Sequence, residues 1–299
     1  MNELQPRCYQ SPDNIGKAVK PFYKRLHNAW VNRAESDPDQ RRSRDMPGNH
    51  RLAQNNIADN TSFLYFMMNI FKPGCMAHIS VRPGLAIPLS LMLVLKYIRG
   101  LQQTEKREKT LLISLTHPME IVENLMAHCL KRNVRPFLNG EIRDQDWPPL
   151  TRAAGDVYGL GIDFWKEGVL FETDHLKRII ESSEIPFGLV VINDATGQLD
   201  QNCCGTISPE QQLIKIRSLT TELKLPVIII DSSYKQEIVS ADVFDYVAQL
   251  NDEVDTYQLS IAKSDTSAYG TLTFVMSPAC NILEDAVSNF TETKPANYN

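Results

Sequence analysis

Short apolar runs alternate with helical patterns along most of this chain, and this alternation constrains the fold more than any other feature. The clearest runs are residues 76–82, 111–116, 188–194 and 226–231, and the first three lead into helical patterns. Continuous apolar strands are typical of a parallel sheet that is covered on both faces, with helices as the crossovers. The sequence therefore predicts an α/β fold with a mainly parallel central sheet flanked by helices.

Three more strand candidates follow, at about 242–250, 257–263 and 270–276, and their close spacing predicts an antiparallel C-terminal extension of the sheet. A chain of 299 residues with 42% hydrophobic content can form one large domain with an additional arm. We expect three parts: a polar arm over 1–60, the α/β core over 61–278, and a flexible tail over 279–299.

The N-terminal arm is basic, although the formal net charge of the whole chain is −5. Residues 1–60 contain ten Lys and Arg against seven Asp and Glu, and the basic residues include Arg41, Arg42, Arg44 and Arg51. A solvated arm and a contact with nucleic acid or a partner protein are both compatible with this cluster. Within the arm, residues 14–33 also form an amphipathic pattern, which predicts either a docking helix or a helix that packs on its own core, through Ile15, Val19, Phe22, Leu26, Ala29 and Trp30.

The cysteine and histidine spacing does not indicate a metal site. The six cysteines form no C-x-x-C pair, and the six histidines show no H-E-x-x-H spacing. The N-terminus has no signal-peptide pattern, and the apolar runs are much shorter than the roughly 20 residues of a membrane span. We therefore expect a cytoplasmic protein with reduced thiols and no membrane partner.

The segment MAHISVRPGLAIPLS (76–90) lies where a phosphate-binding loop would follow a buried strand. A working loop reads G-x-x-x-x-G-K-[ST], in which the Lys contacts the β and γ phosphates and the hydroxyl holds Mg²⁺. Here Ile87 occupies the Lys position and Pro88 occupies the hydroxyl position. Neither residue can supply the charge or the ligand that the chemistry needs.

In this context, several fragments resemble the RecA-like motor domain of DnaB-type replicative helicases, in the order in which that family has them. The resemblance spans most of residues 71–276 and implies a RecA-like P-loop NTPase fold. It is carried by FKPGCMAHISVRPG, LLISLTHPMEIVENLMAH, NGEIRDQDW, VVINDATGQL, ISPEQQLIKIRSLTTELKLPVIIID, ADVFDYVAQL and YQLSIAKSDTSAYGTLTF.

The resemblance also implies that most of the catalytic residues are absent. The position of the family's catalytic Glu falls on Thr116, and the sensor Gln falls on Ser232. The trans-acting K-x-R pair becomes Lys263 and Asp265, and the acidic strand end survives as Asp194 beside Asn193. What remains of a nucleotide pocket is a set of six residues: Arg82, Pro83, Gly84, Asp194, Asp231 and Lys263. Loss of an arginine finger alone lowers the rate by roughly 10³ to 10⁵, so we expect no ATP hydrolysis and no cofactor.

Three functions are compatible with these observations. The first is a DnaB-like protein without ATPase activity that acts as an accessory, loader, inhibitor or scaffold in DNA replication, by docking to a replicative helicase or to its own copies. The second is a divergent DnaB-family ATP-dependent helicase or nucleotide-binding protein, in which Arg82, Lys263 or an arm residue replaces the missing Lys and Asp194 and Asp231 hold Mg²⁺. The third is a DNA-binding accessory protein that uses the basic arm.

Overall fold

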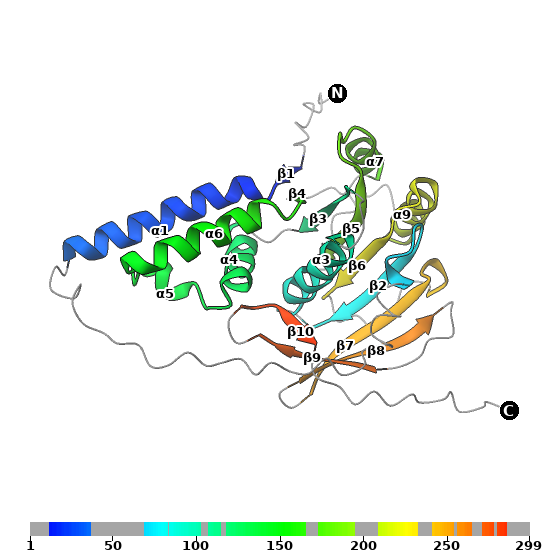
Figure 1. Ribbon diagram of the computed structural model, residues 1–299. Coiled ribbons are helices and arrows are strands. Elements are labelled where there is room, and N and C mark those ends of the chain that lie inside the picture. Colours follow the sequence, from blue (N-terminus) through cyan, green and yellow to red (C-terminus); the bar gives the residue numbers. More distant parts are fainter. Residues whose placement is uncertain are drawn as a thin grey trace, which may run out of the picture.

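A computed structural model describes residues 12–36, 69–82, 84–102, 107–114, 118–165, 173–194, 209–232, 241–253, 256–264, 271–277 and 280–285. These residues form one ten-stranded sheet with helices on both faces (Figure 1). The order of the strands in the sheet is β1-β4-β3-β5-β6-β2-β7-β8-β9-β10.

The sheet has a parallel part and an antiparallel part. The six strands from β4 to β7 in that order run parallel, whereas β1 and the strands β8, β9 and β10 pair with their neighbours in antiparallel fashion. The strand bounds are β1 Asp13–Asn14, β2 Met76–Val81, β3 Lys109–Ser114, β4 Ile162–Trp165, β5 Phe187–Asp194, β6 Val227–Asp231, β7 Tyr246–Glu253, β8 Thr256–Ser264, β9 Thr271–Met276 and β10 Leu283–Asp285.

Two helical layers cover the sheet. Apolar side chains of α3 pack on one face of the sheet and share a core with those of α1, α4 and α6, which lie together beside α3, while the side chains of α7 and α9 pack on the other face. The helix bounds are α1 Gly16–Ser36, α3 Ala86–Gln102, α4 Pro118–Leu130, α5 Arg135–Leu138, α6 Trp147–Tyr158, α7 Thr173–Glu181 and α9 Pro209–Leu223, with short 3₁₀ turns at η2 Asp144–Asp146 and η3 Ala241–Val243. Among the described helices, none combines the length and the apolar character that a membrane crossing requires.

The predicted α/β fold is confirmed, with an antiparallel extension at the C-terminal end of a mainly parallel sheet. The sequence analysis did not identify β4 or α7. It also assigned residues 279–299 to a tail, whereas β10 lies within this segment and pairs with β9. This strand forms because Ile282 and Leu283 are apolar and fully buried.

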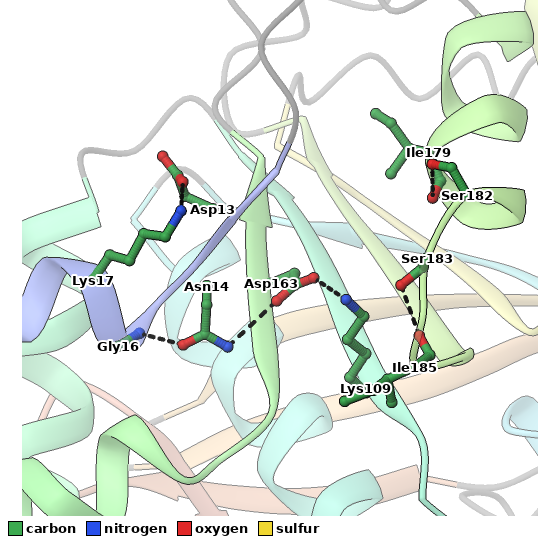
Figure 2. Close-up of polar contacts among 10 residues, drawn as sticks. All are labelled: Asp13, Asn14, Gly16, Lys17, Lys109, Asp163, Ile179, Ser182, Ser183 and Ile185. Carbon is green, nitrogen blue, oxygen red and sulfur yellow. Dashed lines mark hydrogen bonds and ion pairs between the residues drawn. The ribbon is translucent and has the colours of Figure 1, made fainter.

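The entry to α1 is held at the sheet edge by a small polar network (Figure 2). The Asn14 side chain accepts a hydrogen bond from the Gly16 backbone N–H at 2.8 Å and donates to the Asp163 carboxylate on β4 at 3.4 Å. Lys109, at the start of β3, forms an ion pair with the same carboxylate, which is largely buried. The network therefore fixes β1 and α1 to the first parallel strands.

The apolar side of α1 packs on the chain's own helices α4, α5 and α6. Ile15, Val19, Phe22 and Leu26 are buried in the main core. Gly140, in the turn after α5, has a φ of 83°, and a Cβ atom there would lie 2.5 Å from the Ala29 carbonyl oxygen of α1. The backbone of α1 thus packs against this turn so closely that only glycine fits at position 140.

Candidate functional site

The candidate site lies at the carboxyl ends of the parallel strands, where open α/β sheets bind their ligands. The connection from β2 to α3 reaches this edge and contains only Arg82 to Leu85. Gly84 has a φ of 90°, in the left-handed region that glycine favours. A Cβ atom at Gly84 would meet nothing within 4 Å, so this loop is open on that side.

The first turn of α3 is filled by apolar side chains. Ile87 is 7% exposed and belongs to the main core, together with Leu85, Ala86 and Leu89. Pro88 is also buried, and proline is tolerated in the first turn because the backbone N–H there has no partner within the helix. The two residues at the expected Lys and hydroxyl positions thus point their apolar side chains away from solvent.

A buried polar pair lies beneath this turn. The Ser90 hydroxyl donates to the Ala86 carbonyl oxygen at 2.7 Å and accepts from the Asn193 side-chain amide at 3.2 Å. Both residues are almost completely buried, and among the described residues the Asn193 Oδ1 atom has no hydrogen-bond partner. The position of the Mg²⁺-binding hydroxyl of a P-loop NTPase falls on Pro88, in the turn above this pair. In this chain a neutral amide faces the Ser90 hydroxyl, and the pair is closed to solvent.

Polar residues on four neighbouring strands lie in register with one another across the sheet. Asp194 on β5 lies in register with Asp231 on β6, and Asp231 lies in register with Ser80 on β2, which is next to Gln249 on β7. The structure therefore brings the two predicted acidic residues together at neighbouring strand ends. The Asp231 carboxylate also lies 3.8 Å from the Nε2 atom of His78, and this nearly buried ring packs 5.0 Å from the Phe244 ring.

Arg82 is held by an acidic residue of the neighbouring strand. Its guanidinium forms an ion pair with Asp252 near the end of β7, and the two side chains are 51% and 30% exposed. A pair with this exposure contributes only about 0–1 kcal/mol to stability. Arg82 is part of the β2–α3 connection, and its ion pair with Asp252 restrains it only weakly.

Lys263 lies on β8, which is three strands from Asp231 and four strands from Asp194 in the order of the sheet. It pairs in register with Val247, whereas the partner of Arg82, Asp252, pairs with Tyr257 at the other end of β8. Five residues of strand separate Val247 from Asp252, which corresponds to about 17 Å. Within one chain, Lys263 is therefore not brought to Arg82, Asp194 and Asp231.

The remaining predicted residues lie outside the described part of the chain. These are Pro83 and the four arginines of the arm, Arg41, Arg42, Arg44 and Arg51. The sequence analysis also missed the Ser90 and Asn193 pair. A signal was available, since a polar residue in an otherwise apolar helix and an amide at a strand end are both unusual in a core.

A partly buried ion pair was missed as well. Arg217 on α9 binds the Asp245 carboxylate through both of its terminal nitrogens, and the Met76 backbone N–H donates to the same carboxylate at 2.7 Å. This group lies at the amino end of β2, opposite the candidate site. It fixes α9 to the sheet and adds nothing to the nucleotide site.

No family model and no curated protein matches the chain. Two solved structures resemble its fold. One is the structure of an ATPase domain, which superposes with a TM-score of 0.54 at 14% identity, covering 78% of this chain and 93% of that chain. The other is the structure of a DnaB-like replicative helicase and its interactions with primase, which gives a TM-score of 0.54 at 12% identity, covering 90% of this chain and 77% of that chain.

Proposed function

We propose that this chain, whose fold resembles that of DnaB-like helicase ATPase domains, is a DnaB-like protein that has lost ATP hydrolysis. It acts by docking to RecA-like subunits during DNA replication, as an accessory, loader, inhibitor or scaffold. The observation that carries this proposal is the buried, apolar first turn of α3 at Ile87 and Pro88. The neutral Ser90 and Asn193 pair beneath it supports the same conclusion.

Binding of ATP requires that the negative charge of its phosphates be compensated. The β and γ phosphates of ATP and their Mg²⁺ need a cation, a hydroxyl and an acidic group at fixed positions. An apolar helix start leaves the phosphates without that compensation, and desolvating them against Ile87 and Pro88 is costly. A RecA-like surface, in contrast, keeps its shape when these few residues change, so that docking survives the loss of catalysis.

Docking is tested by measuring association of the full-length protein. Sedimentation velocity over a wide concentration range should show either self-association or, after mixing, a complex with the replicative helicase of the same organism. A protein that remains monomeric at high concentration and forms no complex with that helicase contradicts the docking role.

A second function is favoured by Arg82, Asp194 and Asp231. Since Arg82 is half exposed and only weakly restrained, a phosphate could replace Asp252 as its partner, and the two acidic residues lie side by side at the strand ends. The chain would then be a divergent nucleotide-binding protein or helicase. Arg82→Ala and Asp231→Asn should each abolish nucleotide binding in that case, whereas Arg25→Ala, which removes an ion pair between α1 and Glu123 of α4, should not change it.

A further inference from the structure

A cluster of metal-ligating side chains lies where the β9–β10 turn meets the end of α4. His128 is in the last turn of α4, Cys280 lies between β9 and β10, and Glu284 is on β10. One ring nitrogen, the thiol sulfur and one carboxylate oxygen all lie within 4.8 Å of one another. Figure 1 shows β10 next to the helical layer that contains α4. Residues far apart in the sequence are therefore brought together by the fold.

The geometry and the chemistry of these donors suit zinc. Zinc binds sulfur at about 2.3 Å and nitrogen or oxygen at about 2.0–2.2 Å, which places tetrahedral ligands roughly 3.3–3.8 Å apart. The three donor atoms lie within 4.8 Å of one another, about 1 Å beyond this range at most. A thiolate and an imidazole favour zinc over Mg²⁺ and Ca²⁺, which prefer oxygen ligands.

His128 carries a buried nitrogen whose hydrogen-bonding capacity is unused. Its Nε2 atom lies 3.1 Å from an Arg99 nitrogen, and arginine can only donate. The Nδ1 atom is buried and has no hydrogen-bond partner among the described residues. The cluster thus combines a histidine that has a buried ring nitrogen without a partner among the described residues and a buried, reduced thiol, that of Cys280.

A buried thiol such as that of Cys280 has little solvent to stabilise its charged form. A divalent cation would supply the charge that a buried thiolate needs.

The charged groups around the cluster act in both directions. Arg99 on α3 and Lys131 after α4 oppose a cation, while the Glu284 carboxylate attracts it. With the Cys280 thiolate and the Glu284 carboxylate as ligands, a bound Zn²⁺ is neutralised within the site itself. Arg99 is exposed and can leave the His128 ring when the metal binds.

We propose that His128, Cys280 and Glu284 form a zinc site that fastens the β9–β10 turn to the end of α4. Three protein ligands leave the fourth position of a tetrahedral zinc ion to water or to a further side chain. A bound zinc ion would stabilise the short edge strand β10 and with it the end of the sheet. This proposal does not depend on the proposed function.

The test uses the full-length protein, freed of metal with a chelator and kept reduced. We expect one zinc ion per chain in competition with a chromophoric chelator, and a melting temperature that rises with free zinc. Cobalt in place of zinc should give the near-ultraviolet charge-transfer absorption of a thiolate ligand. Cys280→Ser and His128→Gln should each weaken zinc binding by at least about a hundredfold, which exceeds the loss of a supporting contact.

Cys75→Ser is the matched control, because Cys75 is also a buried, reduced thiol but lies at the start of β2. It should leave zinc binding unchanged. The proposal is overturned if the protein binds no zinc, if cobalt shows no thiolate absorption, or if zinc binding survives Cys280→Ser. A disulfide between Cys129 and Cys280 in freshly purified, untreated protein would also overturn it. The cobalt spectrum of the unmodified protein gives an answer even if a variant does not fold.

Discussion

Among single residues, Ile87 determines most about what the β2–α3 connection can bind. Because its side chain is buried in the core, Ile87→Lys should place an unpaired charge there and lower the free energy of unfolding by about 3–5 kcal/mol, without producing ATP hydrolysis. Urea denaturation and a phosphate-release assay measure the two effects. Ile87→Leu is the control and should cost less than about 1.5 kcal/mol. A stable Ile87→Lys protein that releases phosphate contradicts the assignment of this turn to the core.

Tyr97 provides a test of pH dependence. Its hydroxyl donates to the Glu108 carboxylate at 2.6 Å, and burial, together with this carboxylate, raises the pKa of the phenol. The phenol is protonated in both the folded and the unfolded state below pH about 10. Above that pH the unfolded chain loses the proton first, so the stability that Tyr97 contributes is lost as the pH rises.

Tyr97→Phe keeps the ring that packs on Phe71 but removes the hydroxyl. We expect a loss of about 1–2 kcal/mol near neutral pH and a shallower fall of stability above pH about 10. Urea unfolding at both pH values measures the difference. Tyr158→Phe, at a 65% exposed position, should change neither value. An unchanged alkaline slope in Tyr97→Phe would show that other groups set it.

Single residues also show what sequence could and could not predict about the site. The missing phosphate ligands at Ile87 and Pro88 could be predicted, because they follow from residue type at a known spacing. The pairing of Ser90 with Asn193 and the pairing of Arg82 with Asp252 could not, because each depends on which face of an element a side chain occupies. The meeting of His128 with Cys280 depends on the fold as a whole.

At the scale of elements, continuous apolar strands and well-marked helices were predictable, and weak or short ones were not. The strand predicted at 226–231 is β6, and the helical pattern predicted after 111–116 is α4. In contrast, β4 has only four residues and contains Asp163, whose charge is compensated by Lys109 from another strand. Such compensation lies far away in the sequence, so that the local pattern does not show a strand.

The packing of α1 on its own chain leads to a prediction about Gly140. A Cβ atom there would collide with the α1 backbone, and the φ of 83° disfavours any other residue. Gly140→Ala should therefore cost about 2 kcal/mol or more in unfolding free energy. Gly155→Ala, in α6 and with nothing within 4 Å of the new Cβ atom, should instead add about 0.5–1 kcal/mol.

Urea denaturation of both variants measures these opposite effects. If Gly140→Ala is as stable as the unmodified protein, α1 does not pack against Gly140 in solution. The apolar face of α1 would then be better explained by docking to another subunit. A destabilised Gly140→Ala variant supports the packing of α1 on α4, α5 and α6 of the same chain.

At the scale of the whole molecule, the arginine cluster of the basic arm is clear in the sequence but lies outside the described residues. Removing all of 1–60 would also remove the buried side chains of α1. A better test of DNA contact replaces Arg41, Arg42, Arg44 and Arg51 by Ala together. If the arm binds DNA, this variant should lose affinity for a fluorescent oligonucleotide and show a smaller salt dependence of binding.

Lys20→Ala combined with Lys24→Ala, on the outer face of α1, is the matched control for the loss of positive charge. Binding that is equally weak and equally salt-dependent in all three proteins would argue against DNA contact by the arm and would favour protein partners.

The central claim is that the β2–α3 connection, at the carboxyl ends of the parallel strands, no longer binds nucleotide. Titration of the full-length protein with ATP and Mg²⁺ in a calorimeter tests this claim most directly. We expect no heat of binding, because the first turn of α3 is apolar and has neither the Lys nor the hydroxyl that would bind the phosphates and Mg²⁺. Micromolar binding that disappears in Arg82→Ala would contradict the claim and would establish a substitute phosphate ligand.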